Sequence, residues 1–594
     1  MKFDLPRSAK CVAQAWAALG IAFYSISGLA YLYFGSRPVT HQDFWRLYQI
    51  GLTHSWLQSA LLKYGPHSLF FPSLLWLANL HLFHAEQQPL VIAGILLLSM
   101  TVSLLLIPIW RDNIGSLTTK ALSMLVLVVI NFWMGRASIT ASGGYNCICS
   151  LVMLGVAIAF FVLPRMNDRS HEWLEAAVIV VCAGFLASFS FGSGLAIWPT
   201  LLLLAWCLRL RFYSIGVLGA SSMVAAIIFV MLPERDASWQ MDLLPSIARS
   251  AGIWLCQIIG SPPAYAVAGW RSPQLLYQTV DSSISIWFGA IGLMVAIPTI
   301  GYALIRRNIG QSRLKFTGTA LTIFNLLVAI SIVATLPLTR GDPPQVDAPR
   351  YLFWSTLFWC GLLLLLIARS ENVSYLRWLA FCICLAIPIF AFPSHQRWAF
   401  HARYAQRLCD NAATSLINGV HDVEEVKIIA PVYAELTYTV APLLRARRLD
   451  MFAEGLQDWI GQPVETLFDG RHEHEDLKGI LRVEALVDEG NGQLAARVIG
   501  TAFKSHKSVP GQLVIIDPSG TICGIARSAG SGKVLNQILY AGKFPINHFL
   551  GYIRDYDPKL RYVARSADHK AVSDEMIDIE TRTPAPAPTV TTPH

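Results

Sequence analysis

The strongest constraint on this chain is a succession of apolar stretches long enough to cross a membrane. Crossing hydrocarbon takes roughly 20 predominantly apolar residues of helix, and windows of that length predict about eleven spans. With 54% hydrophobic and 14% charged residues among 594, the composition also excludes a set of ordinary soluble domains. The sequence therefore predicts a polytopic α-helical membrane protein with spans near 12–33, 89–110, 118–135, 146–164, 172–190, 193–208, 213–232, 284–305, 316–337, 351–368 and 377–393.

The N-terminal segment favours a permanent first span over a cleaved signal. KFDLPRSAK leads into an apolar stretch over 11–34 that is longer than a signal-peptide core and has no small-x-small cleavage site. We therefore expect the N-terminus to stay attached, on the cytoplasmic side of a bacterial inner membrane.

Basic residues mark alternate connections between the spans. Cytoplasmic connections carry an excess of Lys and Arg, so the formal charge of +8 is interpreted as membrane orientation and not as a nucleic-acid surface. From a cytoplasmic N-terminus, every predicted cytoplasmic connection is basic. These connections carry Lys2, Arg7, Lys10, Arg111, Arg165, Arg169, Arg209, Arg211, Arg306, Arg307, Arg313, Lys315, Arg369 and Arg377.

The opposite connections hold the more elaborate sequence. The first, 34–88, mixes charged residues with an apolar stretch over 68–83 that Pro72 and Asn79 interrupt and that is too short to span. The fourth, 233–283, places apolar residues at helical spacing between Pro245 and Pro262. Both pieces predict helices in the outer interface. The remaining outer connections are 136–145, 191–193 and 338–350.

An odd number of spans places everything after residue 393 in the periplasm. Residues 394–478 predict a helical or mixed connecting region, and 479–578 contain short Val-, Ile-, Leu- and Ala-rich runs between turn signals such as Asn491-Gly492. This pattern is typical of a small antiparallel sandwich or barrel, either a carbohydrate- or acceptor-binding domain or a rigid cap. The tail 579–594 has no apolar face and is expected to be disordered.

Several short motifs resemble the GT-C superfamily of membrane glycosyltransferases. They are His41-Gln42-Asp43 in the first outer loop, HSLFFPSLLWL after it, SFSFGSGLAIWPT, Arg350-Tyr351 and LRARRLDMFA, within residues 1–460. The resemblance implies a GT-C-like catalytic domain over 1–393, which transfers a sugar from a polyprenyl-phosphate carrier to an acceptor at the outer face. It is similar in plan to enzymes that put aminoarabinose on lipid A, or arabinose and mannose on envelope glycans and proteins.

Asp43 is the predicted catalytic residue. A carboxylate within hydrogen-bond reach of an acceptor hydroxyl assists attack at an anomeric carbon, and the superfamily places its catalytic acid in this loop. The alternative is an Asp in the first turn of a helix, where acidic residues are favoured. His41, Arg46 and His54 of the same loop are the predicted acceptor- and sugar-binding residues.

The leaving group of such a reaction is a lipid phosphate, so cationic donors must already be in place beside it. Arg350-Tyr351 is the most persuasive pair, because a fork-shaped donor precedes an aromatic residue at the mouth of a span. Interfacial Arg and Tyr residues are also common membrane anchors, which is the alternative for each. The predicted phosphate-binding residues on the outer side are Lys63, His67, Arg136, Arg271, Arg340, Arg350 and Tyr351.

The predicted function is that of an inverting glycosyltransferase with no cofactor and no obligatory metal. By analogy, the donor sugar is a pentose such as arabinofuranose, and the acceptor is an envelope glycan, a lipid or a protein such as a pilin. The rivals are a flippase or transporter of a lipid-linked sugar and a glycan polymerase or ligase. The spans carry few ionisable residues and no evident two-fold repetition, which disfavours a transporter.

Overall fold

The computed structural model describes the chain except for fifteen short stretches. The residues outside the description are 1–5, 113–114, 168–171, 236–241, 243, 272–281, 341–345, 347, 475, 489–492, 505–508, 529–538, 541–546, 569–570 and 582–594. The chain divides into two compact units, of which the first comprises 1–33, 56–76 and 90–402 and the second 34–55, 77–89 and 403–594.

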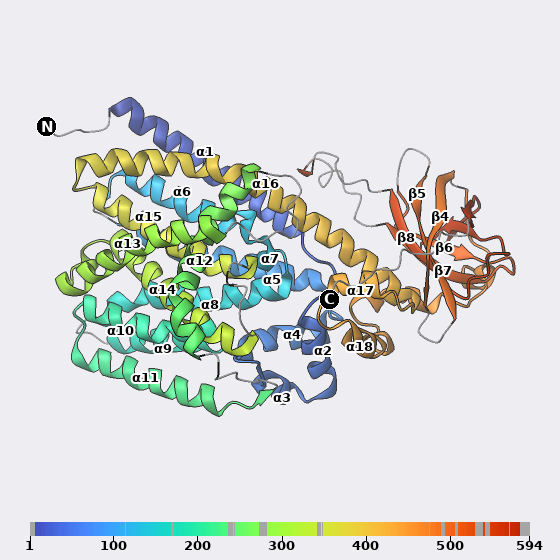
Figure 1. Cartoon of the computed structure of the whole chain (residues 1–594), viewed down its shortest axis with the longest axis horizontal. Coiled ribbons are helices and arrows are strands. Elements are labelled where there is room, and N and C mark those ends of the chain that lie inside the picture. The colour runs from blue at the N-terminus through green and yellow to red at the C-terminus, as the bar shows by residue number, and fades with distance from the viewer. Residues whose placement is uncertain are drawn as a thin grey trace. The chain divides into compact units, whose positions relative to one another are not determined.

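The first unit is a bundle of apolar helices lying side by side (Figure 1). Within the described residues, nine helices are long and apolar enough to cross a membrane, so the chain is a multi-pass membrane protein. The helices that form most of this unit are α1 (Arg7–Phe34), α5 (Gln87–Trp110), α6 (Leu117–Phe132), α8 (Gly143–Val162), α9 (Glu172–Ser188), α10 (Ile197–Cys207), α11 (Phe212–Met231), α12 (Leu244–Arg271), α13 (Ser282–Arg306), α14 (Arg313–Arg340), α15 (Leu352–Ser370) and α16 (Ser374–Asn418).

Two of the eleven predicted spans form helices shorter than the roughly 20 residues that cross a membrane. The span predicted over 172–190 is α9, with 17 residues, and the one over 193–208 is a 3-10 turn, η3 (Gly192–Ala196), followed by the 11 residues of α10. Their connection is a tight reversal, since a Cβ on Gly194 would lie 1.8 Å from the Ala187 carbonyl oxygen. The count of eleven membrane crossings stays a prediction.

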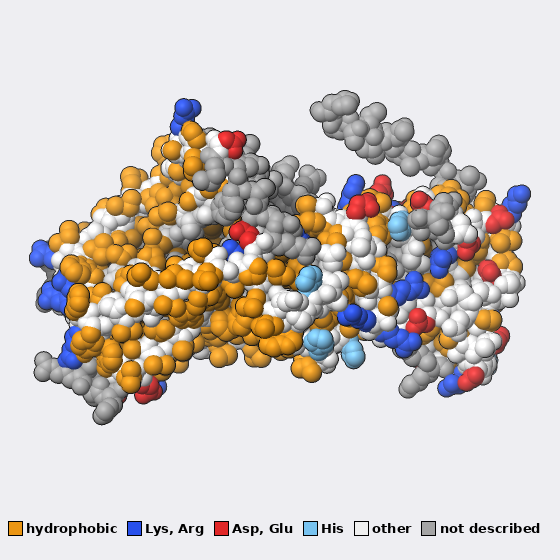
Figure 2. Space-filling view, turned by 90° about the horizontal axis from the view of Figure 1, so that it is seen from below, with side chains coloured by type: hydrophobic (Ala, Val, Ile, Leu, Met, Phe, Trp, Pro, Cys, Tyr) orange, Lys and Arg blue, Asp and Glu red, His pale blue; other side chains and the backbone are white. Residues whose placement is uncertain are grey.

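The connections predicted to be cytoplasmic meet at one end of this bundle. Asp112 Oδ2 accepts a hydrogen bond of 2.7 Å from Ser312 Oγ, and Arg307 Nε donates one of 2.9 Å to the Trp206 carbonyl. Figure 2 shows hydrophobic side chains along the flank of the unit and Lys and Arg side chains gathered at this end, on the left. The helices therefore alternate in direction as the basic pattern predicts, whereas the side of the membrane stays a prediction.

The opposite connections also meet one another. The Lys63 N–H donates a 2.9 Å hydrogen bond to the Pro233 carbonyl, and the His67 ring stacks on Phe191 with the ring centroids 4.0 Å apart. Lys63–Tyr64 (β1) and Glu234–Arg235 (β2) pair as two short parallel strands. The first, third and fourth predicted outer connections thus come together, although long stretches of sequence separate them.

The helix α12 is longer than the sequence indicates. A helix was expected between Pro245 and Pro262, but α12 runs for 28 residues and continues through that proline. Its backbone touches α13, because a Cβ on Gly260 would lie 1.7 Å from the Ser285 carbonyl oxygen and one on Gly289 would lie 1.9 Å from that of Cys256. Paired glycines therefore let these two helices approach closely. Whether α12 lies in the interface stays a prediction.

The predicted last span and the helix expected after it form one element. The helix α16 has 45 residues and contains Pro388 and Pro393, so neither proline ends it. The helix α4 (Phe70–Leu82) has 13 residues, which fits the expectation of a piece too short to span.

The strands of the second unit close into a barrel, which is one of the two forms, sandwich or barrel, that the sequence predicts. The barrel is antiparallel except for the parallel pair of the first and last strands, in the order β11-β4-β5-β8-β7-β6-β9. A bulge between Val483 and Ala485 bends the long β4–β5 hairpin. The strands are β4 (Leu477–Asp488), β5 (Leu494–Lys504), β6 (Gln512–Ile516), β7 (Ile522–Ser528), β8 (His548–Ile553), β9 (Val563–Ser566) and β11 (Ile577–Glu580).

Two strands are not among the runs that the sequence analysis predicts as strands. β8 is between β5 and β7 in the barrel, and β11 runs two residues into the stretch 579–594 that was expected to be a disordered tail. Both strands contribute to a core that includes Leu481, Ile515 and Ile553. Residues 582–594 of the predicted tail lie outside the described residues.

A buried ion pair joins the barrel to the helices before it. Asp422, which caps α17 (Val423–Ile429), receives two hydrogen bonds from Arg497 of β5, at 2.8 and 2.7 Å, and one of 2.8 Å from the Tyr552 hydroxyl of β8. Asn418, at the end of α16, exchanges hydrogen bonds of 3.0 and 2.8 Å with the backbone of Ile525 in β7. These contacts fix the barrel to the end of α16.

We expect the Asp422→Ala variant to lose about 3 kcal/mol of stability, because the buried Arg497 would keep only its longer contacts with Glu424, at 3.3 Å, and Glu484, at 3.7 Å. Asp578→Ala is the matched control. It also removes the carboxylate from a two-bonded pair, with Arg561, but both side chains of that pair are exposed, so the loss should be about 0.2–1 kcal/mol. Limited proteolysis of the whole chain across a urea series measures the loss of stability in each of the two variants. Equal losses would contradict the anchoring role of Asp422.

Candidate functional site

Asp43 is half-buried at the start of α2 (Phe44–Thr53), in the second unit. It occupies the N-cap position, yet its side chain makes no capping hydrogen bond to the helix, and only its carbonyl accepts from Arg46 N and Leu47 N, both at 3.1 Å. This position at the start of a helix is also the one that the alternative of a helix-N-terminal acid predicts. The catalytic role of Asp43 stays a prediction.

The loop before Asp43 is held by other parts of the second unit. The Gln42 N–H donates to the Ile429 carbonyl, and the Thr40 N–H donates to Asp450 Oδ2 at 2.9 Å. The Asp450 N–H in turn donates to the His84 carbonyl at 2.7 Å. Three segments that are distant in sequence, around residues 40, 84 and 450, are thus joined through backbone groups and the Asp450 carboxylate.

These same segments carry unusual backbone conformations. Gln42, His84, Ala85, Arg448 and Asp450 all have φ between 50° and 61°, the left-handed region that side chains other than glycine rarely adopt. Each such residue costs on the order of 1–3 kcal/mol and persists only where surrounding contacts determine it, which is frequent at functional sites. The position of Asp43 is therefore fixed by the fold at an energetic cost.

His41 lies inside the loop. Its side chain is 1% exposed, and burial, with the charge of Arg37 as a smaller cause, holds its pKa well below the usual value. Its Nδ1 is 3.0 Å from the Val39 carbonyl, and because a carbonyl only accepts, Nδ1 carries the proton of the neutral ring. A neutral His41 that holds its own loop suits a positioning role, and its acceptor-binding role stays a prediction.

The other two predicted acceptor-binding residues differ in exposure. Arg46 is half-buried on α2, and His54 is exposed at the end of that helix, with Nδ1 2.9 Å from the Thr53 hydroxyl. Arg46 lies within α2, whereas Asp43 and His54 are its N-terminal and C-terminal caps.

Asp450 is a residue of this region that the sequence analysis did not single out. It is 6% exposed, its Oδ1 has no hydrogen-bond partner among the described residues, and burial raises its pKa to about 7. The only sequence signal was its place in the LRARRLDMFA motif, where an Asp after a basic run looks like a solvated charge. Its burial comes from its contacts with residues about 400 positions earlier in the chain.

In the first unit, Arg136 is the most deeply buried of the predicted phosphate-binding residues. It is 0% exposed, and its guanidinium lies 3.9 Å from the centroid of the Phe353 ring. Nη1 makes long hydrogen bonds of 3.3–3.4 Å to Ile130 and Asn131, while Nε and Nη2 have no partner among the described residues. A buried guanidinium with donors unused is costly, so it suits a site that receives an anion.

The turn that carries Arg136, η1 (Met134–Arg136), is held by the helix α16. The Met134 N–H donates to His395 Nδ1 at 3.1 Å, and Trp133 Nε1 donates to Ser394 Oγ at 2.9 Å. Gly135 makes the turn possible, since a Cβ there would lie 2.2 Å from the Trp133 ring.

Arg350 and Tyr351 lie on the neighbouring turn, η6 (Pro349–Tyr351), which packs beside η1. The Arg350 guanidinium is 5.0 Å from the centroid of the Tyr351 ring, and its Nε has no partner among the described residues. The structure thus brings together the two turns that carry Arg136 and Arg350, about 200 residues apart in sequence.

Lys63 and His67 are engaged in other contacts. Lys63 is buried, with Nζ 3.4 Å from Glu234 and 5.4 Å from the centroid of the Phe229 ring. His67 stacks on Phe191, and a Cβ on Gly192 would lie 2.6 Å from its Nδ1, so the SFSFGSG turn requires glycine there. Both residues hold outer connections together, and their phosphate-binding role stays a prediction.

Arg271 and Arg340 are the last residues of α12 and α14, and their side chains lie outside the described part of the structure. Within the described part of the chain, no group of three or more His, Cys, Asp or Glu side chains could hold a metal ion. The absence of a metal requirement stays a prediction.

Comparisons with known proteins find a distant similarity to solved structures. The chain is 11% identical to the archaeal oligosaccharyltransferase AglB from Archaeoglobus fulgidus in complex with an inhibitory peptide and a dolichol-phosphate, with a TM-score of 0.35 over 69% of this chain. A crystal structure of the Archaeoglobus fulgidus oligosaccharyltransferase with Zn and sulfate gives 11% identity and a TM-score of 0.31, also over 69% of this chain. The match covers 59% and 56% of those chains. No family model and no curated protein match.

We expect the stability of the protein to fall between pH 5.5 and 8 because Asp450 must ionise inside the fold. With the folded pKa raised to about 7 from 3.8, its contribution is fully present below about pH 4 and is lost as the pH rises through 7. Between pH 5.5 and 8 the loss is about 2 kcal/mol. Asp450→Asn removes the titration, so thermal melts of the variant should lack this part of the pH dependence. Identical pH profiles for both proteins would contradict a raised pKa.

Proposed function

We propose that this chain is an inverting membrane glycosyltransferase that moves a sugar from a polyprenyl-phosphate carrier to an acceptor at the outer membrane face. The observation that carries the proposal is the loop of Asp43. It is held in a costly backbone conformation by two distant segments, through Ile429 and Asp450, and its carboxylate does not cap its own helix. An ordinary connecting loop has no need of such constraint.

In the proposed reaction Asp43 is the general base. The acceptor hydroxyl oxygen attacks the anomeric carbon from the face opposite the phosphate, and the Asp43 carboxylate takes the hydroxyl proton. The new C–O bond forms as the bond from the anomeric carbon to the phosphate oxygen breaks, and the electron pair leaves with that oxygen. One displacement inverts the anomeric configuration, and the products are the glycosylated acceptor and the polyprenyl phosphate.

Arg136 and Arg350 are the proposed phosphate-binding pair. Negative charge builds on the phosphate as the glycosidic bond breaks, so cations that are already in place stabilise the transition state more than the ground state. Unused donors on two adjacent turns, with aromatic rings beside both guanidinium groups, support this assignment. An arginine fork also matches the geometry of phosphate oxygens.

The finer parts of the proposal rest on the resemblance seen in the sequence. They are a pentose donor such as arabinofuranose, an envelope glycan, lipid or protein as acceptor, and a bacterial inner membrane with Asp43 and the barrel on the periplasmic side. The proposed chemistry needs a hydroxyl acceptor and a lipid-phosphate leaving group in any of these cases.

Asp43→Asn should reduce transfer of labelled sugar from a polyprenyl-phosphate donor by a factor on the order of 10²–10⁴, because the amide cannot accept the proton. Asp469→Asn, an exposed carboxylate of the second unit, is the control and should keep full turnover. Transfer assays with purified protein in liposomes and a panel of pentose and hexose donors measure the turnover of both variants. Turnover unaffected by Asp43→Asn would remove the base, and movement of intact donor between leaflets without transfer would instead identify a flippase.

Arg350→Gln and Arg136→Gln should each lower kcat/KM for the lipid donor by roughly 10- to 100-fold, since a hydrogen bond to a charged group contributes about 1.5–3 kcal/mol. Arg306→Gln, an exposed arginine at the other end of the bundle, is the control. Turnover is referred to the amount of folded protein from size-exclusion chromatography. A lower melting temperature with unchanged turnover would show that Arg136 only supports the fold.

A further inference from the structure

A pocket opens at the basic end of the helix bundle, opposite the turns of Arg136 and Arg350. Its volume is about 210 Å³, several times the roughly 30 Å³ that one water molecule occupies. It lies between the ends of α5, α8 and α14, within the first unit. It is smaller than the ~300–1,000 Å³ typical of sites that enclose a whole drug-sized ligand, so it suits one part of a larger molecule.

The pocket combines an apolar wall with a cationic rim. Its wall is formed mainly by Leu104, Leu105, Pro108, Ala157, Phe160, Phe161 and Phe316. Its basic residues are Arg111, after α5, Arg165 of η2 (Leu163–Asn167), and Arg313, the first residue of α14. Because each arginine comes from a different connection, the sequence alone does not bring them together.

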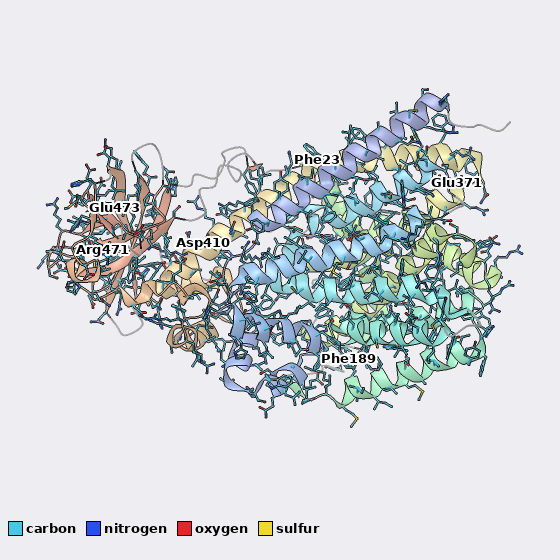
Figure 3. The ribbon with its side chains drawn as sticks, turned by 180° about the vertical axis from the view of Figure 1, so that it is seen from behind. Phe23, Phe189, Glu371, Asp410, Arg471 and Glu473 are labelled. Carbon is cyan, nitrogen blue, oxygen red and sulfur yellow. The ribbon has the colours of Figure 1, made fainter. Side chains whose placement is uncertain are left out.

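The three arginines are not neutralised by the carboxylates nearby. None of them forms an ion pair with a residue that the structure describes, and all three are exposed. The Asp112 carboxylate binds the start of α14, where Oδ2 accepts hydrogen bonds from Ser312 Oγ at 2.7 Å and from the Leu314 N–H at 3.1 Å. Glu371 accepts from Thr119 and Ser116 at the start of α6, and Figure 3 shows it at the turn between α15 and α16.

We propose that this pocket binds the phosphate headgroup of an anionic glycerophospholipid from the leaflet on the basic side of the membrane. Arginine forks match phosphate oxygens, and each basic residue near an anionic membrane surface contributes about 1 kcal/mol. The apolar wall receives the first part of the acyl chains, since a free anion would gain nothing from three phenylalanine rings. Such basic pockets between helices are a known kind of lipid site.

This site is separate from the proposed catalysis. It lies at the other end of the bundle from the turns η1 and η6, and it shares no residue with the proposed base or phosphate pair. Loss of either function therefore leaves the other testable.

Native mass spectrometry of the full chain in detergent, titrated with phosphatidylglycerol, tests the proposal. We expect one phosphatidylglycerol to bind on the order of tenfold or more tightly than uncharged phosphatidylcholine, and millimolar inorganic phosphate should not displace it. This selectivity requires no variant. Equal retention of the two lipids, or complete displacement by inorganic phosphate, would overturn the proposal.

The site itself is tested with a charge-matched pair of triple variants. Arg111→Gln, Arg165→Gln and Arg313→Gln together should remove most of the selectivity. The combination of Arg7→Gln, Arg209→Gln and Arg306→Gln removes the same charge from the same end, outside the pocket lining, and should keep it. Equal losses in the two combinations would show a general surface charge effect and overturn the site.

A substitution in the wall keeps the test decisive if the pocket triple variant does not fold. Leu104→Trp fills part of the pocket from a half-buried position and leaves all three arginines in place. It should weaken retention of phosphatidylglycerol on the order of tenfold, whereas retention equal to that of the natural chain would contradict binding inside the pocket.

Discussion

The helical unit depends on the need to satisfy every backbone N–H and C=O group where no water is present. Helices meet this requirement internally, so long apolar segments become helices whatever else they contain. It explains why α16 continues through two prolines and α12 through Pro262. It also confines reversals and charged residues to the two ends of the bundle.

The two ends of the bundle use their polar groups differently. At the basic end, carboxylates such as that of Asp112 accept hydrogen bonds from the first residues of helices. The exposed arginines of the pocket therefore stay available to anionic groups at the membrane surface. At the opposite end, cations are buried and individually engaged, as Lys63 is with Glu234, or are held with unused donors, as Arg136 is. The first arrangement suits a lipid surface, and the second suits recognition of one anionic group.

The Asp43 loop shows how a position is fixed by contacts outside its own segment. Its anchors are the Ile429 carbonyl and the Asp450 carboxylate, and Asp450 is itself held by the His84 carbonyl. Strained residues on all three segments share the cost of this arrangement. A carboxylate held in this way is suited to proton transfer, because it needs little reorganisation when an acceptor arrives.

The sequence by itself determined the apolar helices, the alternation of basic connections and most strands of the barrel, because these follow from local periodicity and charge. Only the tertiary structure decided that the strands close into a barrel, that Asp450 is buried beside the Asp43 loop, and that Arg136 and Arg350 lie on adjacent turns. It also decided that Lys63 and His67 are engaged elsewhere. The physical reason is that burial, pairing and strain arise from contacts between residues hundreds of positions apart, and a local pattern carries no record of them.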